Sequence, residues 1–233
     1  MELLFSIASH SILENTETYL SEKDLNADER RTIDIFYNQS PISNYQVKKM
    51  WGRQLNVFQV AKWLDKANRL IPFGEAHKIP WRSPYPERDV YGILSKTAPH
   101  LKFTKSEVSI GHQKLKEMGI SKQQQFICFH ARDPAYLEAF LPMSASDTNW
   151  DYQDFRDSDI NNYLAAAETM VSRGYYSLRM GAIVQEPLDT DCDGIIDYAT
   201  INRTEFLDIF LAAKCRFFLC STNGIYAIPM CFR

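Results

Sequence analysis

Hydrophobic positions in the first half of the chain alternate between short runs typical of strands and spacings typical of helices. The runs predict strands at residues 1–9, 32–37 and 55–59. The spacings predict helices at residues 11–20, 44–53 and 60–71. In the last helix, Val60, Trp63, Leu64 and Ala67 recur at i, i+3, i+4 and i+7, which predicts a buried apolar face. Such alternation is typical of βαβ units on a parallel sheet.

The second half repeats the alternation. Apolar runs predict strands at residues 125–130, 175–180, 195–198 and 216–219. Helices are expected at residues 104–119, 158–173 and 204–213, with another helix opened by the turn after the last strand. Residues suited to cap helix N-termini stand at Asn44, Thr104, Ser158 and Thr204, and Gly174 is a helix stop. The fold class predicted is α/β with two parallel-sheet domains.

A segment rich in proline and aromatic residues, 72–90, separates the two halves. It is irregular and predicts a connection that is neither helix nor strand. The domain boundary should follow it, between Pro99 and Ser121. We therefore expect one domain at residues 1–100 and a second at residues 101–233.

Composition places the chain among ordinary globular proteins. Hydrophobic residues make up 45% and charged residues 24%, which excludes a disordered tail or a fibre. With a net charge of -3, the chain has no basic excess that would indicate nucleic acid or an anionic membrane as a partner. Residues 1–120 hold 17 basic and 14 acidic residues, whereas residues 121–233 hold 9 and 15. A phosphorylated ligand in the acidic half would therefore need a few placed arginines and backbone amides.

The cysteines and the hydropathy of the chain indicate where in the cell the protein is found. The five cysteines are odd in number and include no CxxC pair, so neither a disulfide framework nor a zinc site is indicated. The opening residues lack the basic region of a signal peptide, and no apolar run is long enough to span a membrane. We expect a cytoplasmic protein, with peripheral attachment to the inner face of the membrane as the alternative.

Polar residues follow three strands predicted in the second half. In an open parallel sheet, ligands bind beyond the carboxyl ends of the strands. The segments that follow the strands, residues 130–133, 179–181 and 221–224, should converge on one crevice at the edge of the sheet. Their arginines and backbone amides could hold a diphosphate there. The alternative is that Arg132 pairs with Asp133 or Asp157 and only ties loops together, and that His130 anchors a loop. The candidate donor-binding residues are His130, Arg132, Asp133, Arg179, Gly181, Ser221, Thr222, Asn223 and Gly224.

Two residues near the first strand could act on an acceptor. His10 follows that strand, so an imidazole there could take a proton from a sugar hydroxyl. Glu17 lies two helical turns further on and could orient it. A helix-capping role for this segment explains the same residues.

An acidic string in the second half resembles the start of a calcium loop. Asp189, Asp191 and Asp193 precede Gly194 with the right spacing, but the twelfth position, where a bidentate Glu is needed, is Thr200. A tight Asp-Gly turn explains the string better. We therefore expect no metal, and keep calcium binding as an alternative.

Longer stretches resemble a bacterial family of glycosyltransferases with surface-polysaccharide functions. The likeness is carried by FICFHARDPAYL, FRDSDINNYLAAAETMVSRGYYSLRMG, IIDYA and RTEFLDIFLAAKCRFFLCSTNGIYAIPMCF, and upstream by SHSILENTETYL, SNYQVKKMWGR and LKFTKSEVSIGHQKLKEMGI. Ser9 and Ser6 depart from the family, which usually has glycine and a basic residue there. The family's sequence also continues past Arg233, so we expect a fragment whose second domain is incomplete.

The resemblance implies a fold of the glycosyltransferase-B type, with two Rossmann-like domains and a nucleotide-sugar held mainly by the second. His130-x-Arg132-Asp133 is similar to the diphosphate-binding strand end of fucosyltransferase-like enzymes. The expected function is metal-independent sugar transfer from a nucleotide-sugar to a surface-glycan or lipid-linked acceptor. The alternatives are a non-catalytic sugar- or nucleotide-binding module and a calcium-stabilised interaction module.

Overall fold

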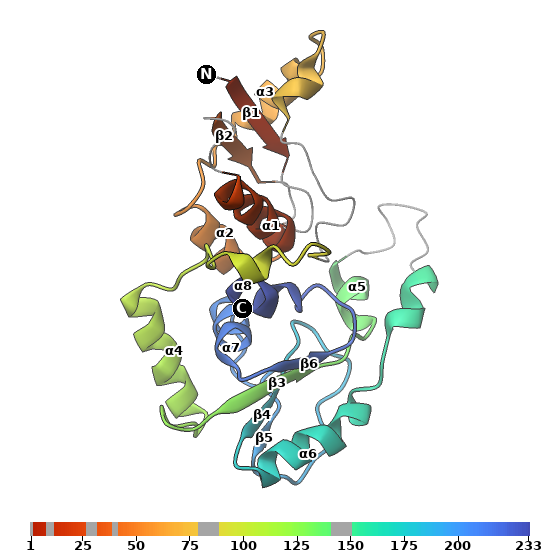
Figure 1. Ribbon diagram of the computed structural model, residues 1–233. Coiled ribbons are helices and arrows are strands. Elements are labelled where there is room, and N and C mark those ends of the chain that lie inside the picture. The colour runs from red at the N-terminus through yellow and green to blue at the C-terminus, as the bar shows by residue number, and fades with distance from the viewer. Residues whose placement is uncertain (1, 8–11, 27–31, 39–41, 79–88, 141–150) are drawn as a thin grey trace. The chain divides into compact units, whose positions relative to one another are not determined.

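The computed structural model describes residues 2–7, 12–26, 32–38, 42–78, 89–140 and 151–233. The chain forms two compact units, residues 1–103 with 230–233 and residues 104–229. Both are mixed α/β and contain parallel strands (Figure 1). Among the described residues, no helix has both the length and the apolar character needed to cross a bilayer.

The first unit begins with a βαβ arrangement. β1 (Glu2–Ile7) and β2 (Thr32–Tyr37) pair in parallel, and α1 (Ile12–Leu25) lies between them in sequence. α2 (Tyr45–Trp51) follows, and its cap is the predicted Asn44, whose side chain accepts a hydrogen bond from the Val47 amide at 3.0 Å. α2 buries Met50 and Trp51 as its spacing predicts.

The predicted strand at residues 55–59 is wrong. Val57 forms a single parallel bridge with Phe36. One turn closes from Trp51 to Leu55 on one side, and another from Phe58 to Ala61 on the other. The apolar run therefore has room for one bridge and cannot extend the sheet.

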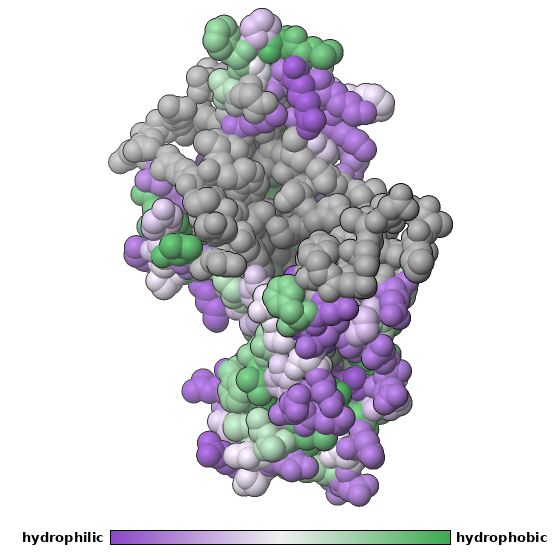
Figure 2. Space-filling model, turned by 90° about the vertical axis from the view of Figure 1, so that its right-hand side faces the viewer, coloured by the Kyte–Doolittle hydropathy of each residue, from purple (hydrophilic) through white to green (hydrophobic). Residues whose placement is uncertain are grey.

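α3 (Ala61–Asn68) is shorter than predicted, and the face that was predicted to be buried is exposed. Its buried residues are Ala61, Asp65 and Asn68, whereas Trp63 and Leu64 of the expected core face are exposed. Figure 2 shows apolar and strongly polar residues side by side at the top of the view, where Figure 1 places α3. Two short 3-10 helices, η1 (Gly74–His77) and η3 (Leu94–Lys96), complete the described part of this unit before its last four residues.

The second unit is built on a four-stranded parallel sheet of order β5-β4-β3-β6. Its strands are β3 (Phe126–His130), β4 (Tyr176–Arg179), β5 (Ile195–Ile196) and β6 (Phe218–Cys220). Each coincides with a predicted strand to within a few residues. Ile127, Phe129 and Leu178 are fully buried, which places the core on the two central strands.

Helices of the second unit include those predicted, with one different start, and two short ones, at residues 135–140 and 151–156, that were not predicted. α4 (Lys105–Glu117) begins at a capping box formed by Thr104 and Glu107, and α7 (Glu205–Lys214) is capped by Thr204. The remaining helical elements are α5 (Ala135–Phe140), η4 (Asp151–Arg156), η5 (Ile160–Tyr163), α6 (Leu164–Ser172) and α8 (Ala227–Phe232), the last ending beyond this unit.

Ser158 is not a helix cap. Asp159 accepts the hydrogen bond from the Asn161 amide at 2.8 Å and starts a 3-10 turn, which continues into α6. Gly174 ends this helix as predicted, because its φ of 86° lies in the left-handed region that favours glycine. Ala167 and Val171 of α6 pack with Phe129 and Ile195 of the sheet.

Candidate functional site

The ends of β3, β4 and β6 lie side by side, as the sequence predicts. Phe129 is opposite Arg179 on one side and Leu219 on the other, and His130 is opposite Cys220. The polar segments that follow these strands therefore leave the sheet at the same edge. This edge, with the turns at residues 130–133, 180–181 and 221–224, is the candidate ligand site of the second unit.

Arg132 joins two of these turns to a third loop. Its amide donates to the Ser221 hydroxyl at 3.1 Å, and its carbonyl accepts from the Ser158 amide at 2.9 Å. Its guanidinium forms an ion pair with Asp157. The contacts of Arg132 therefore agree with the alternative in which it ties loops together.

Acidic and basic groups share this edge. Burial raises the pKa of the Asp157 carboxyl; the positive charges of Arg132 and Arg156 oppose this effect, and the negative charges of Asp154 and Asp133 add to it. Asp133 itself accepts a hydrogen bond from the Ala135 amide at 3.0 Å. An anionic ligand would add to the negative charge at this edge, so it could bind the Arg132 guanidinium only by displacing Asp157.

Arg156 is a site residue that the sequence analysis missed. Its Nε and Nη2 atoms donate to the Thr222 carbonyl at 3.2 and 3.0 Å. It lies within an acidic stretch that reads as a solvated loop, and its partner is 66 residues away in sequence. No local pattern signals such a contact.

The turn after β6 is also held by its own groups. Asn223 donates to the Ser221 carbonyl at 2.7 Å and accepts from the Ile225 amide at 3.0 Å. α8 begins at Ala227, three residues after Gly224, and has six residues. The turn does lead into a helix, but the expected cradle of amides at a helix N-terminus is not formed by residues 221–224.

Arg179, a predicted donor-binding residue, makes its described contacts with the loop after β4 and with the residue that follows β5. It is nearly fully buried, and its guanidinium donates to the Glu186 carbonyl at 2.7 Å and pairs with Asp197 at 3.2 Å. Asp197 also accepts from the Leu188 amide at 2.8 Å. Arg179 therefore ties the loop after β4 to the end of β5.

His130 and Gly181 lie together for reasons of packing. Burial lowers the pKa of the His130 imidazole, so the ring is neutral and its Nδ1–H donates to the Met180 carbonyl at 2.8 Å. A Cβ at Gly181 would lie 2.6 Å from Val184 and 3.3 Å from Ala199. The loop-anchoring alternative considered for His130 therefore accounts for its contacts.

The calcium alternative finds no support in the geometry. Asp189, Asp191 and Asp193 are exposed in the loop before β5. In the described parts of the chain, His, Cys, Asp and Glu side chains nowhere gather in groups of three or more that could hold a metal ion.

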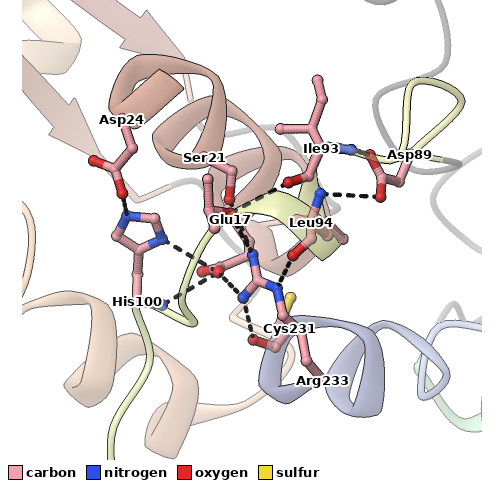
Figure 3. Close-up of polar contacts among 10 residues, drawn as sticks. Glu17, Ser21, Asp24, Asp89, Ile93, Leu94, His100, Cys231 and Arg233 are labelled. Carbon is pink, nitrogen blue, oxygen red and sulfur yellow. Dashed lines mark hydrogen bonds and ion pairs between the residues drawn. The ribbon is translucent and has the colours of Figure 1, made fainter. Parts of the chain in front are cut away.

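The first unit holds a buried ionic cluster around Glu17 (Figure 3). Glu17 is 0% exposed, and its Oε1 accepts from the His100 amide and Nδ1, both at 3.2 Å, and from Arg233 at 2.7 Å. His100 Nε2 lies 3.1 Å from Asp24. Arg233 also donates to Ser21 at 3.0 Å.

Charge balance governs this cluster. Both ring nitrogens of His100 face carboxylates, and the hydrogen bond to Glu17 raises the imidazole pKa against the effect of burial. Burial alone would raise the pKa of Glu17, but the hydrogen bonds from His100 and Arg233 outweigh it and lower that pKa. Arg233 and His100, together with the carboxylates of Glu17 and Asp24, thus fasten α1 to the segment around His100 and to the last residue.

The predicted pairing of Glu17 with His10 stays a prediction. His10 lies outside the residues that the structure describes. Glu17 Oε1 binds His100 and Arg233, and its Oε2 is buried without a hydrogen-bond partner. The described contacts of Glu17 are structural.

Comparison with known proteins identifies no relative. No protein-family model, no curated protein and no solved structure matches this chain.

Proposed function

We propose that this chain is a glycosyltransferase that binds the diphosphate of a nucleotide-sugar over the ends of β3, β4 and β6. The observation that carries the proposal is the position of Arg132, two residues past a central parallel strand and hydrogen-bonded to the turn after its neighbour. Open parallel sheets bind ligands at this edge. The resemblance of this segment to diphosphate-binding strand ends supports the same assignment.

In the proposed reaction, the positive charges at this edge stabilise the diphosphate that leaves. The acceptor hydroxyl oxygen attacks the anomeric carbon, the bond to the diphosphate oxygen breaks, and the diphosphate leaves with the electron pair. Arg132 exchanges Asp157 for the diphosphate and neutralises it, and Arg156 adds positive charge at the same edge. His10 is the proposed base that takes the acceptor's proton, and the proposed transfer requires no metal.

The proposal extends to architecture and location. Each unit is a Rossmann-like domain of the glycosyltransferase-B type, and the second unit binds the donor. The acceptor is a surface glycan or its lipid-linked precursor, and the reaction takes place in the cytoplasm or at the inner face of the membrane.

The test is calorimetry with UDP and GDP on the full chain. Arg132→Lys keeps the ion pair's charge but loses the guanidinium's paired donors, so affinity for the bound nucleotide should fall by about 1.5–3 kcal/mol. Arg173→Lys, at the exposed end of α6, is the matched control and should bind like the wild type. Unchanged affinity in Arg132→Lys would assign Arg132 to loop packing alone.

A non-catalytic binding module is the second candidate. It is favoured by the contacts of Glu17, whose Oε1 binds His100 and Arg233 instead of a catalytic histidine. Release of nucleoside diphosphate from a UDP- or GDP-sugar separates the two candidates. Binding with turnover that His10→Asn abolishes supports the enzyme, whereas binding without turnover supports the module.

A further inference from the structure

α3 and the turn after it carry an exposed apolar surface. We call this surface the α3 patch, and its residues are Val60, Trp63, Leu64, Leu70, Ile71 and Phe73. Trp63 is 67% exposed, Leu70 86% and Phe73 90%. Large apolar side chains gathered so closely on a surface mark a site of interaction.

The orientation of α3 is determined by polar contacts on its buried side. Asp65 is 1% exposed and accepts from the Tyr37 hydroxyl at 3.2 Å and from Arg69 at 2.8 Å. Asn68 donates to the Gly74 carbonyl at 2.6 Å and contacts His77 at 2.7 Å. Turning the apolar face inward would break these bonds and leave the buried Tyr37 hydroxyl without Asp65, so the α3 patch stays outside.

The charges beside the α3 patch have one sign. Residues 60–73 are all described, and their acidic residue, Asp65, is buried. The charged residues exposed in this segment are Lys62, Lys66 and Arg69. Successive residues of a helix lie about 100° apart around its axis. These three basic residues therefore form a stripe along α3, between its buried side and the edge of the α3 patch at Trp63.

Trp63 and Lys66 are in contact at that edge. The Lys66 ammonium lies 4.7 Å from the centre of the Trp63 ring. An indole beside lysines is the combination that helices lying in a membrane interface use, with the ring at headgroup level and the ammonium groups on lipid phosphates.

We infer that the α3 patch docks on the surface of a bilayer that contains anionic lipids. Its apolar side chains enter the boundary between headgroups and acyl chains, and Lys62 and Lys66 bind headgroup phosphates, while Arg69 stays paired with Asp65. The positive stripe is complementary to an anionic surface, which favours this occupant over a neutral protein face. The inference does not depend on the sugar-transfer proposal.

The experiment is sedimentation of the full chain with vesicles of POPC and POPG at a ratio of 70:30, and with vesicles of POPC alone. The wild type should bind the anionic vesicles, bind POPC much more weakly, and dissociate as salt rises. Lys62→Gln/Lys66→Gln should weaken binding to the anionic vesicles about 30-fold, at about a fivefold factor per lysine.

A second variant tests the apolar contribution. Trp63→Ser/Phe73→Ser should weaken binding at least tenfold on the anionic vesicles, because both side chains leave water on docking. Both positions are exposed, so circular dichroism should show an unchanged fold. The matched controls, Phe155→Ser and Lys116→Gln/Lys122→Gln, change exposed residues of the second unit and should bind like the wild type.

Three results would overturn the inference. The first is a wild type that does not sediment with anionic vesicles. The second is equal loss of binding in the control variants. The third is a dimer by light scattering that Trp63→Ser/Phe73→Ser dissociates, because the α3 patch would then be covered by a second copy of the chain.

Discussion

Replacing Glu17 by Gln leaves His100 and Arg233 without the carboxylate that both bind. The amide oxygen can still accept their hydrogen bonds, and its NH₂ group takes the place of the buried Oε2, which has no partner. Glu17→Gln therefore mainly removes the charge. Removing one member of a buried ion pair costs about 3–5 kcal/mol, but both partners are 18% exposed, so we expect a loss of about 2–4 kcal/mol.

The loss should depend on pH. The pKa of His100 is raised in the folded chain, so its contribution to stability is complete below its unfolded pKa of about 6.5 and disappears as pH rises through the folded value. The pKa of Glu17 is lowered, so its contribution is present above about 4.5 and is lost in acid. The effect of Glu17→Gln should be greatest between these values and smaller at pH 8.5.

Urea unfolding at pH 5.5 and pH 8.5 tests this. Three of the four tryptophans lie in residues 1–103, so a Trp150→Phe background makes tryptophan emission report the first unit, which includes the buried Trp51. Glu22→Gln, in the same helix, is the control and should cost about 1 kcal/mol or less. Equal losses for Glu17→Gln at both pH values would refute the coupling of Glu17 to protonated His100.

Three substitutions in the second unit probe packing and capping, each measured by the urea midpoint from circular dichroism. Thr104→Ala removes the cap of α4 and should cost about 1 kcal/mol; no change would mean that the capping box is dispensable. Gly111→Ala places a Cβ 2.3 Å from the buried Phe210 ring and should cost about 1–3 kcal/mol, whereas a gain would mean that the ring moves aside freely. Tyr198→Phe removes the hydroxyl 2.9 Å from buried Asp208 and should cost about 1–3 kcal/mol; a neutral result would show that Asp208 finds another donor.

Elements whose signals are local could be predicted. The caps at Asn44, Thr104 and Thr204 were expected from residue type, and each acts on an amide three residues along the chain. The strands of the second unit could be predicted because continuous apolar runs are typical of a sheet buried on both faces. The carboxyl ends of these strands were expected to meet because parallel strands end at the same edge of a sheet.

The prediction for α3 failed because the apolar spacing identified a face but not its direction. Asp65 and Asn68 are buried because Tyr37, His77 and Gly74 provide their partners. These partners come from other elements, and periodicity within one helix carries no information about them. The exposed apolar face that results is the surface for which we infer lipid binding.

The sequence by itself determined where most strands and helices lie and which residues end them, because those preferences act within a few residues. The tertiary structure alone decided the partners of the charged residues. Arg132 meets Asp157, Arg179 meets Asp197, and Glu17 meets an arginine 216 positions away. An ion pair forms between groups that folding brings within about 4 Å. That distance depends on where each loop is placed on the sheet, which no local pattern encodes.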